Sequence, residues 1–98
     1  MGDRDFQVDP RELAYRQAYS DYTNHVMGCR DCYAPNGRYC AAGEPLHLEA
    51  DARYMMTVPD RYSRARLLAL DFKTRPAFAE RLKSRVVELF DQAKEGGE

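Results

Sequence analysis

Four side chains that commonly bind metal ions lie within sixteen residues, and they constrain this chain more than any other feature. They are His25, Cys29, Cys32 and Cys40. A single ion accepts these spacings, because short turns supply pairs of ligands and helical residues four positions apart share one face. We therefore predict that all four residues bind one metal ion.

The donor set favours zinc, with an iron–sulfur cluster as the alternative. Tetrahedral zinc uses nitrogen and sulfur donors at about 2.0 to 2.3 Å, and four protein ligands leave no open position for water or substrate. Such a site is structural, and structural zinc contributes roughly 10 kcal/mol or more to the folding of small peptides. Three cysteines and one histidine also suit iron. His47 is a poor substitute ligand, because a helix would separate it from Cys40 by about 10 Å, and we expect it at the surface or rim.

The pattern His-x-x-x-Cys-x-x-Cys in residues 25–32 resembles the zinc-binding motif of zinc-associated anti-sigma factors, which are small helical bacterial proteins. The resemblance covers His25, Cys29 and Cys32. The family's fourth ligand lies upstream of the histidine, whereas this chain offers Cys40 downstream. In its arginine-rich composition, and in the pair Cys29-x-x-Cys32 followed by Cys40, the chain also resembles small actinobacterial and actinophage proteins, including the WhiB-like regulators. Those regulators carry four cysteines and a Gly-rich turn with tryptophan, whereas this chain has three cysteines and no tryptophan. The resemblance implies a regulator that binds a protein of the transcription machinery.

Length and cysteine content set the class of protein. With 98 residues, we expect one domain over residues 1–98, with flexible segments at 1–8 and 95–98. Chains this short bury little apolar surface, so a metal ion would add needed stability. No apolar run is long enough for a membrane helix, and the acidic N-terminus is unlike a signal peptide. We expect a cytoplasmic protein without a membrane partner, where cysteines favour metal binding over structural disulfides.

Apolar periodicity predicts four helices and no strand. Asp9, Pro10 and Glu12 are typical of a helix start, and Gly28 is placed where helices often end in a left-handed turn. This first helix should end near residue 27, and the others are expected at about 44–56, 60–72 and 75–93. A turn is predicted at residues 34–37. The fold class is therefore all-α, a bundle of about four helices with a zinc-stapled turn between the first two.

Each expected helix has a candidate buried face. In the first helix, a stripe of Tyr15, Tyr19 and Tyr22 is expected to be a core face rather than a binding surface. The expected faces of the later helices are Leu48, Ala52, Met55 and Met56; Ala65, Leu68, Ala69 and Phe72; and Phe78, Leu82, Val86, Leu89, Phe90 and Ala93.

Basic residues gather in the second half of the chain, although the net charge is only −1. Residues 61–85 hold eight basic and two acidic side chains, which gives +6. The candidate binding residues for a nucleic acid or a protein partner are Arg61, Arg64, Arg66, Lys73, Arg75, Arg81, Lys83 and Arg85. A pI near 6.1 argues against a large phosphate footprint, so a protein partner is favoured.

Three functional hypotheses remain from the sequence. The first is a cytoplasmic zinc-binding regulatory protein with a protein partner, in transcription control if the anti-sigma resemblance holds. The second is direct nucleic-acid binding through the basic residues. The third is a thiol redox sensor, in which Cys29 and Cys32 form a disulfide and expel zinc. An enzyme is the least favoured class, because no Gly-rich phosphate loop, serine elbow or His-Glu-x-x-His motif is present.

Overall fold

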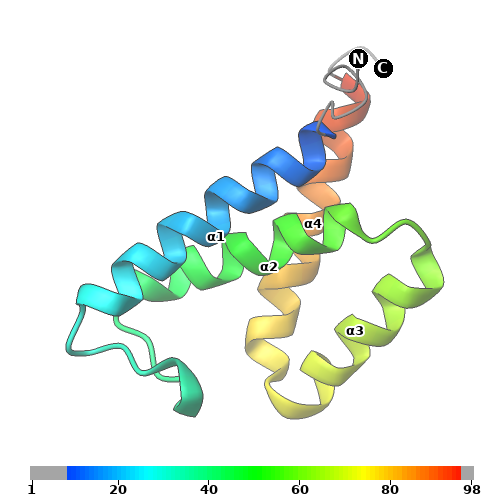
Figure 1. Cartoon of the computed structure of the whole chain (residues 1–98). Coiled ribbons are helices and arrows are strands. Elements are labelled where there is room, and N and C mark those ends of the chain that lie inside the picture. Colours follow the sequence, from blue (N-terminus) through cyan, green and yellow to red (C-terminus); the bar gives the residue numbers. More distant parts are fainter. Residues whose placement is uncertain (1–8, 96–98) are drawn as a thin grey trace, which may run out of the picture.

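The computed structural model of the chain, which describes residues 9–95, consists of helices joined by short loops (Figure 1). Within that range the α-helices are α1 (Pro10–Gly28), α2 (Gly43–Thr57), α3 (Arg61–Thr74) and α4 (Pro76–Glu95), and a short 3-10 helix, η2 (Ala34–Asn36), lies between α1 and α2. The predicted all-α bundle is confirmed. The flexibility expected at 1–8 and 95–98 concerns residues outside this range, apart from residue 95, which ends α4.

Capping residues explain where the helices begin. The side chain of Asp9 accepts a hydrogen bond of 2.9 Å from the backbone N–H of Arg11, which satisfies one free donor of the first turn of α1. Asp60 caps α3 in the same way, accepting from the backbone N–H of Ser63 at 3.0 Å. Proline occupies the first position of α4, where its missing N–H costs nothing. Each observed helix end lies within two residues of its predicted position.

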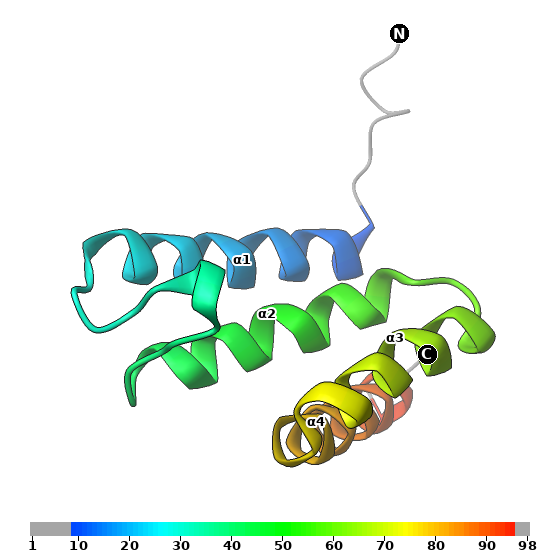
Figure 2. The same ribbon diagram turned by 90° about the horizontal axis from the view of Figure 1, so that it is seen from below.

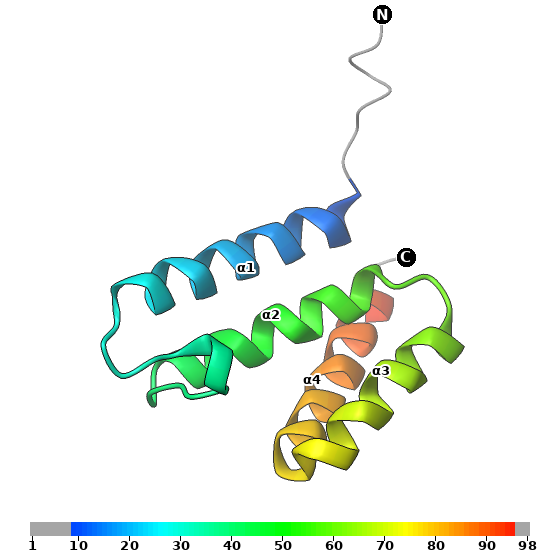
Figure 3. The same cartoon turned by 60° about the horizontal axis from the view of Figure 1, so that its bottom comes forward.

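The helices form two pairs that cross at α2 and α4. Helix α1 runs along α2 in the opposite direction, and α3 runs along α4 (Figures 1 and 3). In the view of Figure 2, α1 and α2 occupy the upper part of the picture, and the α3–α4 pair lies below them. The main helix contacts join α1 to α2, α2 to α4 and α3 to α4. Helix α2 therefore connects the α1 side of the molecule to α4.

The core lies mainly between α2 and α4. Its buried cluster consists of Ala52, Met55, Met56, Phe78, Leu82, Val86 and Leu89, with Leu48, Leu68 and Phe90 packed against it. The apolar faces predicted for α2 and α4 are largely confirmed, although Ala93 is exposed. In α3 the prediction was wrong for Ala65 and Ala69, which are exposed. The reason is that α3 packs mainly on α4: of its four predicted residues, Leu68 packs against the core cluster and Phe72 is half-buried.

The tyrosine stripe of α1 packs on α2 without being fully buried. Tyr15 and Tyr22 are half-buried, while Tyr19 is 50% exposed. The ring of Tyr15 lies 5.5 Å from that of Tyr54 on α2, measured between centroids. The tyrosine stripe therefore forms the side of α1 that faces α2, and it lies outside the buried core cluster.

Between residues 9 and 95, no helix combines the length and the apolar character that a bilayer span requires.

Candidate metal centre

The end of α1 positions the first two candidate ligands. His25 lies in the last helical turn, and Cys29 directly follows the helix, so the two side chains leave the same face. The helix ends because Cys29 is extended (φ −110°, ψ 125°), and its N–H donates to the carbonyl of Val26. Gly28 is helical without a positive φ, so the left-handed helix end expected there was wrong.

The loop between the second and third cysteines reverses direction at the predicted turn. After η2 (Ala34–Asn36), Gly37 has a φ of 68°, in the left-handed region that glycine adopts without strain. Tyr33 and Arg38 flank the turn and exchange two backbone hydrogen bonds of 2.7 and 3.1 Å. This closed reversal brings the chain back to the metal centre at Cys40.

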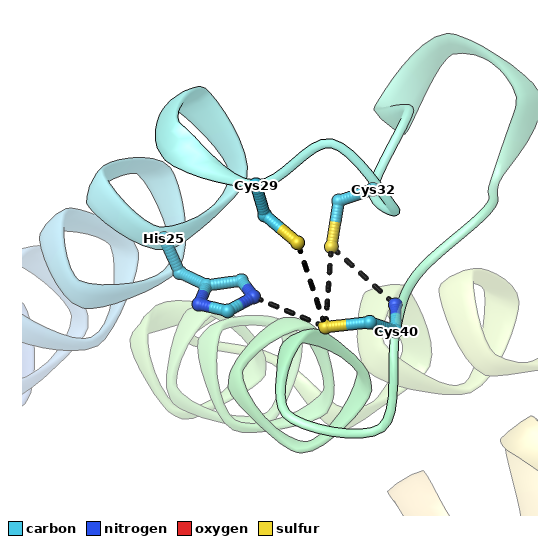
Figure 4. A group of neighbouring side chains, drawn as sticks. All are labelled: His25, Cys29, Cys32 and Cys40. Carbon is cyan, nitrogen blue, oxygen red and sulfur yellow. Dashed lines mark hydrogen bonds between the residues drawn. The ribbon is translucent and has the colours of Figure 1, made fainter.

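The four predicted ligands point toward one another (Figure 4). Their donor atoms all lie within 4.8 Å of one another. The Sγ atom of Cys40 is 3.8 Å from that of Cys29 and 3.7 Å from that of Cys32. It is 3.2 Å from Nε2 of His25. A tetrahedron with metal–sulfur bonds of about 2.3 Å has edges of about 3.8 Å, so these sulfur separations suit a single tetrahedral ion.

Backbone amides support the sulfur atoms. The N–H of Cys40 donates to Sγ of Cys32 at 3.4 Å, and the N–H of Gly43 donates to Sγ of Cys40 at 3.3 Å. The imidazole of His25 and the N–H of Gly43 lower the pKa of the Cys40 thiol to about 6. Thiolate is the form of cysteine that binds metal. The surroundings of Cys40 thus favour the ligand form at neutral pH.

Gly43, the first residue of α2, lies against the site and was not identified from the sequence. A Cβ atom at this position would lie 2.7 Å from Sγ of Cys32 and 3.2 Å from Cδ2 of His25. Real Cβ atoms do not come as close as 2.7 Å to another atom, so a side chain here would displace Sγ of Cys32 and crowd the ring of His25. The sequence does contain one indication: Gly43 follows the last cysteine by three residues. A glycine there lets the backbone come close to the metal ligands.

The donor set and its geometry fit a metal ion with no vacant coordination position. The imidazole comes from the last turn of α1, and the three thiols come from the segment between α1 and α2; Cys32 is buried while the other ligands are half-buried. An ion held there would link the end of α1 to the loop that leads into α2, in addition to the packing of α1 on α2. This arrangement suits a structural role, because a catalytic zinc keeps a position for water or substrate.

The eight predicted basic residues divide into two groups. Arg81 pairs with Glu44 at 2.8 Å, Arg85 pairs with Glu49 at 2.8 Å, and Arg75 pairs with Asp71 at 3.2 Å. These three arginines hold α4 and its start against neighbouring helices.

The remaining five basic residues form no ion pair within residues 9–95. Arg64 donates to the carbonyl of Val58 at 2.6 Å, which leaves Arg61, Arg66, Lys73 and Lys83 most available for a partner.

A second polar cluster, beside the metal centre, was missed by the sequence analysis. Arg75 donates to Nε2 of His47 at 3.0 Å and lies 3.5 Å from the carboxylate of Asp51. Burial and the nearby guanidinium of Arg75 lower the pKa of His47 to about 4. Burial raises the pKa of Asp51 to about 6, although Arg75 acts in the opposite direction. His47, expected at the surface or rim, is instead a packed neutral side chain that is 13% exposed.

No protein-family model, no curated protein and no solved structure matches the chain. The residues of the site itself are therefore the basis for any functional inference.

Proposed function

We propose that this protein is a small regulatory domain in which one zinc ion, bound by His25, Cys29, Cys32 and Cys40, fixes α1 to α2, and that the domain binds a protein partner. The observation that carries the zinc assignment is the pair of sulfur separations at Cys40, 3.8 and 3.7 Å. They equal the edge of a zinc–thiolate tetrahedron within about 0.1 Å.

Zinc explains the donor geometry better than an iron–sulfur cluster. The thiolates of a cluster bind separate iron atoms across inorganic sulfides, so they stand farther apart than ligands of one ion. Here all four donor atoms lie within 4.8 Å of one another. When bound, zinc would supply folding free energy, on the order of 10 kcal/mol in small peptides.

A protein partner is favoured over a nucleic acid by the ion pairs of α4. Phosphate binding needs several cations free to face one polyanion. Arg75, Arg81 and Arg85 are each paired with carboxylates of the same chain. A partner in the transcription machinery remains our proposal, supported by the resemblance of residues 25–32 to zinc-associated anti-sigma factors.

Metal analysis with circular dichroism tests the zinc centre, and the two histidines provide a matched pair of variants. We expect about one zinc per chain in protein purified under reducing conditions, and loss of helicity after chelation. His25→Asn and Cys32→Ser should lose zinc, whereas His47→Asn should keep it. Iron with visible absorbance would replace zinc in the proposal, and absence of any metal would refute it.

A binding experiment separates the two kinds of partner. Affinity purification from a cell extract with the zinc-loaded chain should recover a protein after nuclease treatment. Titration with duplex DNA at physiological salt should show no saturable binding. Tight DNA binding that weakens steeply with salt would instead establish the nucleic-acid hypothesis.

A thiol switch is the second candidate function, favoured by the position of Cys40. Its sulfur lies within contact distance of both other cysteine sulfurs. Cys29 and Cys40 are also partly exposed, so an oxidant could reach them. Oxidation would convert two zinc ligands into a disulfide and release the ion, which would give the regulatory domain a redox input.

A further inference from the structure

Helix α3 leaves an open groove beside α2. None of the residues Arg61–Thr74 of this helix is fully buried, because its main packing partner is α4. The groove has a volume of about 530 Å³. It is lined by Tyr54 and Val58 from α2 and the loop that follows, and by Ser63, Arg66, Leu67, Ala69, Leu70 and Lys73 from α3.

Apolar side chains form the floor of this groove, and water reaches them. Leu70 is 62% exposed, Tyr54 is 45% exposed and Leu67 is 37% exposed. Scattered apolar residues are normal on a surface, but several large ones in one concavity are typical of a protein-binding site. The exposed fractions thus indicate a surface from which a partner would exclude water.

Positive charge surrounds the floor. Arg66 and Lys73 line the groove, and within residues 9–95 no acidic side chain lines it. These two cations form no ion pair in the described chain, unlike Arg75, Arg81 and Arg85. Arg66 and Lys73 are seven residues apart, so about 10 Å of helix separates them along one face.

The spacing of the charges defines a complementary ligand. Leu67 and Leu70 lie between Arg66 and Lys73 on the same side of α3. A helix packed along this strip would present apolar residues to the leucines and acidic residues, two turns apart, to the cations. On this chain's own α4, basic residues stand between Glu80 and Glu88, so α4 of a second copy lacks that pattern.

We propose that the groove between α2 and α3 is the docking site for an acidic amphipathic helix of the partner protein. This inference deepens the proposed function, because it rests on the chain having a protein partner. The leucines and Tyr54 supply the apolar contact, and Arg66 and Lys73 set the orientation of the helix. The metal centre lies outside the groove and acts only by holding α1 on α2.

The test is a nuclear magnetic resonance titration of the zinc-loaded full chain with a synthetic helical peptide of about four turns. The peptide carries leucines on one face and glutamates two turns apart beside them, and a second peptide carries lysines in place of the glutamates. We expect the glutamate peptide to shift amide signals of residues 63–73 and of Tyr54. The lysine peptide should cause no saturable shift.

Charge reversal identifies the cations that matter. Lys73→Glu and Arg66→Glu should each lower the affinity for the glutamate peptide about tenfold. The double variant should bind the lysine peptide instead. Lys94→Glu is the matched control, because Lys94 is an exposed lysine on α4 that does not line the groove, and it should leave binding unchanged. Leu70→Ser removes apolar contact at an exposed position and should also weaken binding.

Several results would overturn the docking site. They are the absence of saturable binding by the glutamate peptide, signal shifts confined to α1, or equal weakening of peptide binding by Lys94→Glu. Concentration-dependent broadening of residues 63–73 without peptide would make a second copy the occupant. Zinc content measured on the same samples tests the zinc centre separately, and recovery of a partner from cell extract tests protein binding whether or not the groove is used.

Discussion

The imidazole of His47 stacks on the ring of Tyr39, with 4.5 Å between ring centroids and 20° between ring planes. His47 also stacks on Phe78 of α4, with 5.1 Å between ring centroids. Tyr39 directly precedes the candidate ligand Cys40, and its hydroxyl hydrogen-bonds that of Tyr22 at 2.9 Å. This column of rings connects the metal loop, through α2, to α4.

Replacing His47 by alanine should destabilise the folded chain by about 2 kcal/mol or more, because both ring contacts are lost and a cavity forms. His47→Phe is the matched variant: it retains the stacking and loses only the hydrogen bond from Arg75. Urea unfolding of zinc-loaded protein measures both changes. Equal stability of the alanine and phenylalanine variants would show that stacking contributes little.

The pKa of His47 predicts a specific pH dependence. Because the pKa falls from 6.5 to about 4 on folding, the folded state binds fewer protons than the unfolded state between these values. The resulting stabilisation is present above pH 6.5 and is lost as the pH falls toward 4. We therefore expect wild type to lose stability relative to His47→Phe over this interval. Taking the difference cancels the titration of the metal ligands, which both proteins share.

Asp51 should show the opposite dependence. Burial raises its pKa from 3.8 to about 6, so the folded state holds the proton more tightly than the unfolded state. Its stabilising contribution is present below pH 3.8 and is lost as the pH rises through about 6. Wild type should therefore gain stability relative to Asp51→Asn when the pH falls from 7 to 4. A constant difference between the two proteins would contradict the assigned burial of this carboxylate.

The helices and the ligand cluster were predictable because the determining residues lie close together in the sequence. The start of α1 is set by two adjacent residues, the cap Asp9 and Pro10. The four candidate metal ligands likewise lie in one short stretch of the chain. The regular apolar repeat of α4 predicted its buried face for the same reason. Local spacing was enough in these cases.

Other features depend on how the helices cross, and sequence periodicity does not contain that information. Ala69 has the spacing of a core residue in α3, yet it lines an open groove because α3 packs mainly on α4. The environment of His47 is set by Tyr39 in the metal loop and Phe78 in α4. Gly43 was missed because its importance comes from the side chains of His25 and Cys32 that converge above it.

Gly43 should be required for metal binding, whereas Gly28 should not. In Gly43→Ala the new methyl group would displace Cys32 and His25, and we expect zinc affinity to fall about 10- to 100-fold. A Cβ at Gly28 meets no atom within 4 Å, so Gly28→Ala should bind zinc normally. It should also gain up to about 1 kcal/mol in helix stability. Competition with a chromophoric chelator measures both affinities, and equal values would show that Gly43 does not support the site.

The sulfur positions predict which disulfide forms on oxidation. Hydrogen peroxide accepts two electrons and two thiol protons, giving one disulfide and two molecules of water. Cys40 lies within 3.8 Å of Cys29 and of Cys32, so we expect it in the first disulfide, in place of the Cys29–Cys32 pair suggested by sequence spacing.

Peptide mapping by mass spectrometry can identify that disulfide, because Arg30 and Arg38 place the three cysteines on three different tryptic peptides. After peroxide treatment of the zinc-loaded chain, peptides linked through Cys40 should dominate and zinc should be released in proportion. In Cys40→Ser, disulfide formation should slow, since the bridging sulfur is absent. A dominant Cys29–Cys32 link would contradict the assignment of Cys40, and retention of zinc with all thiols reduced would exclude the redox switch altogether.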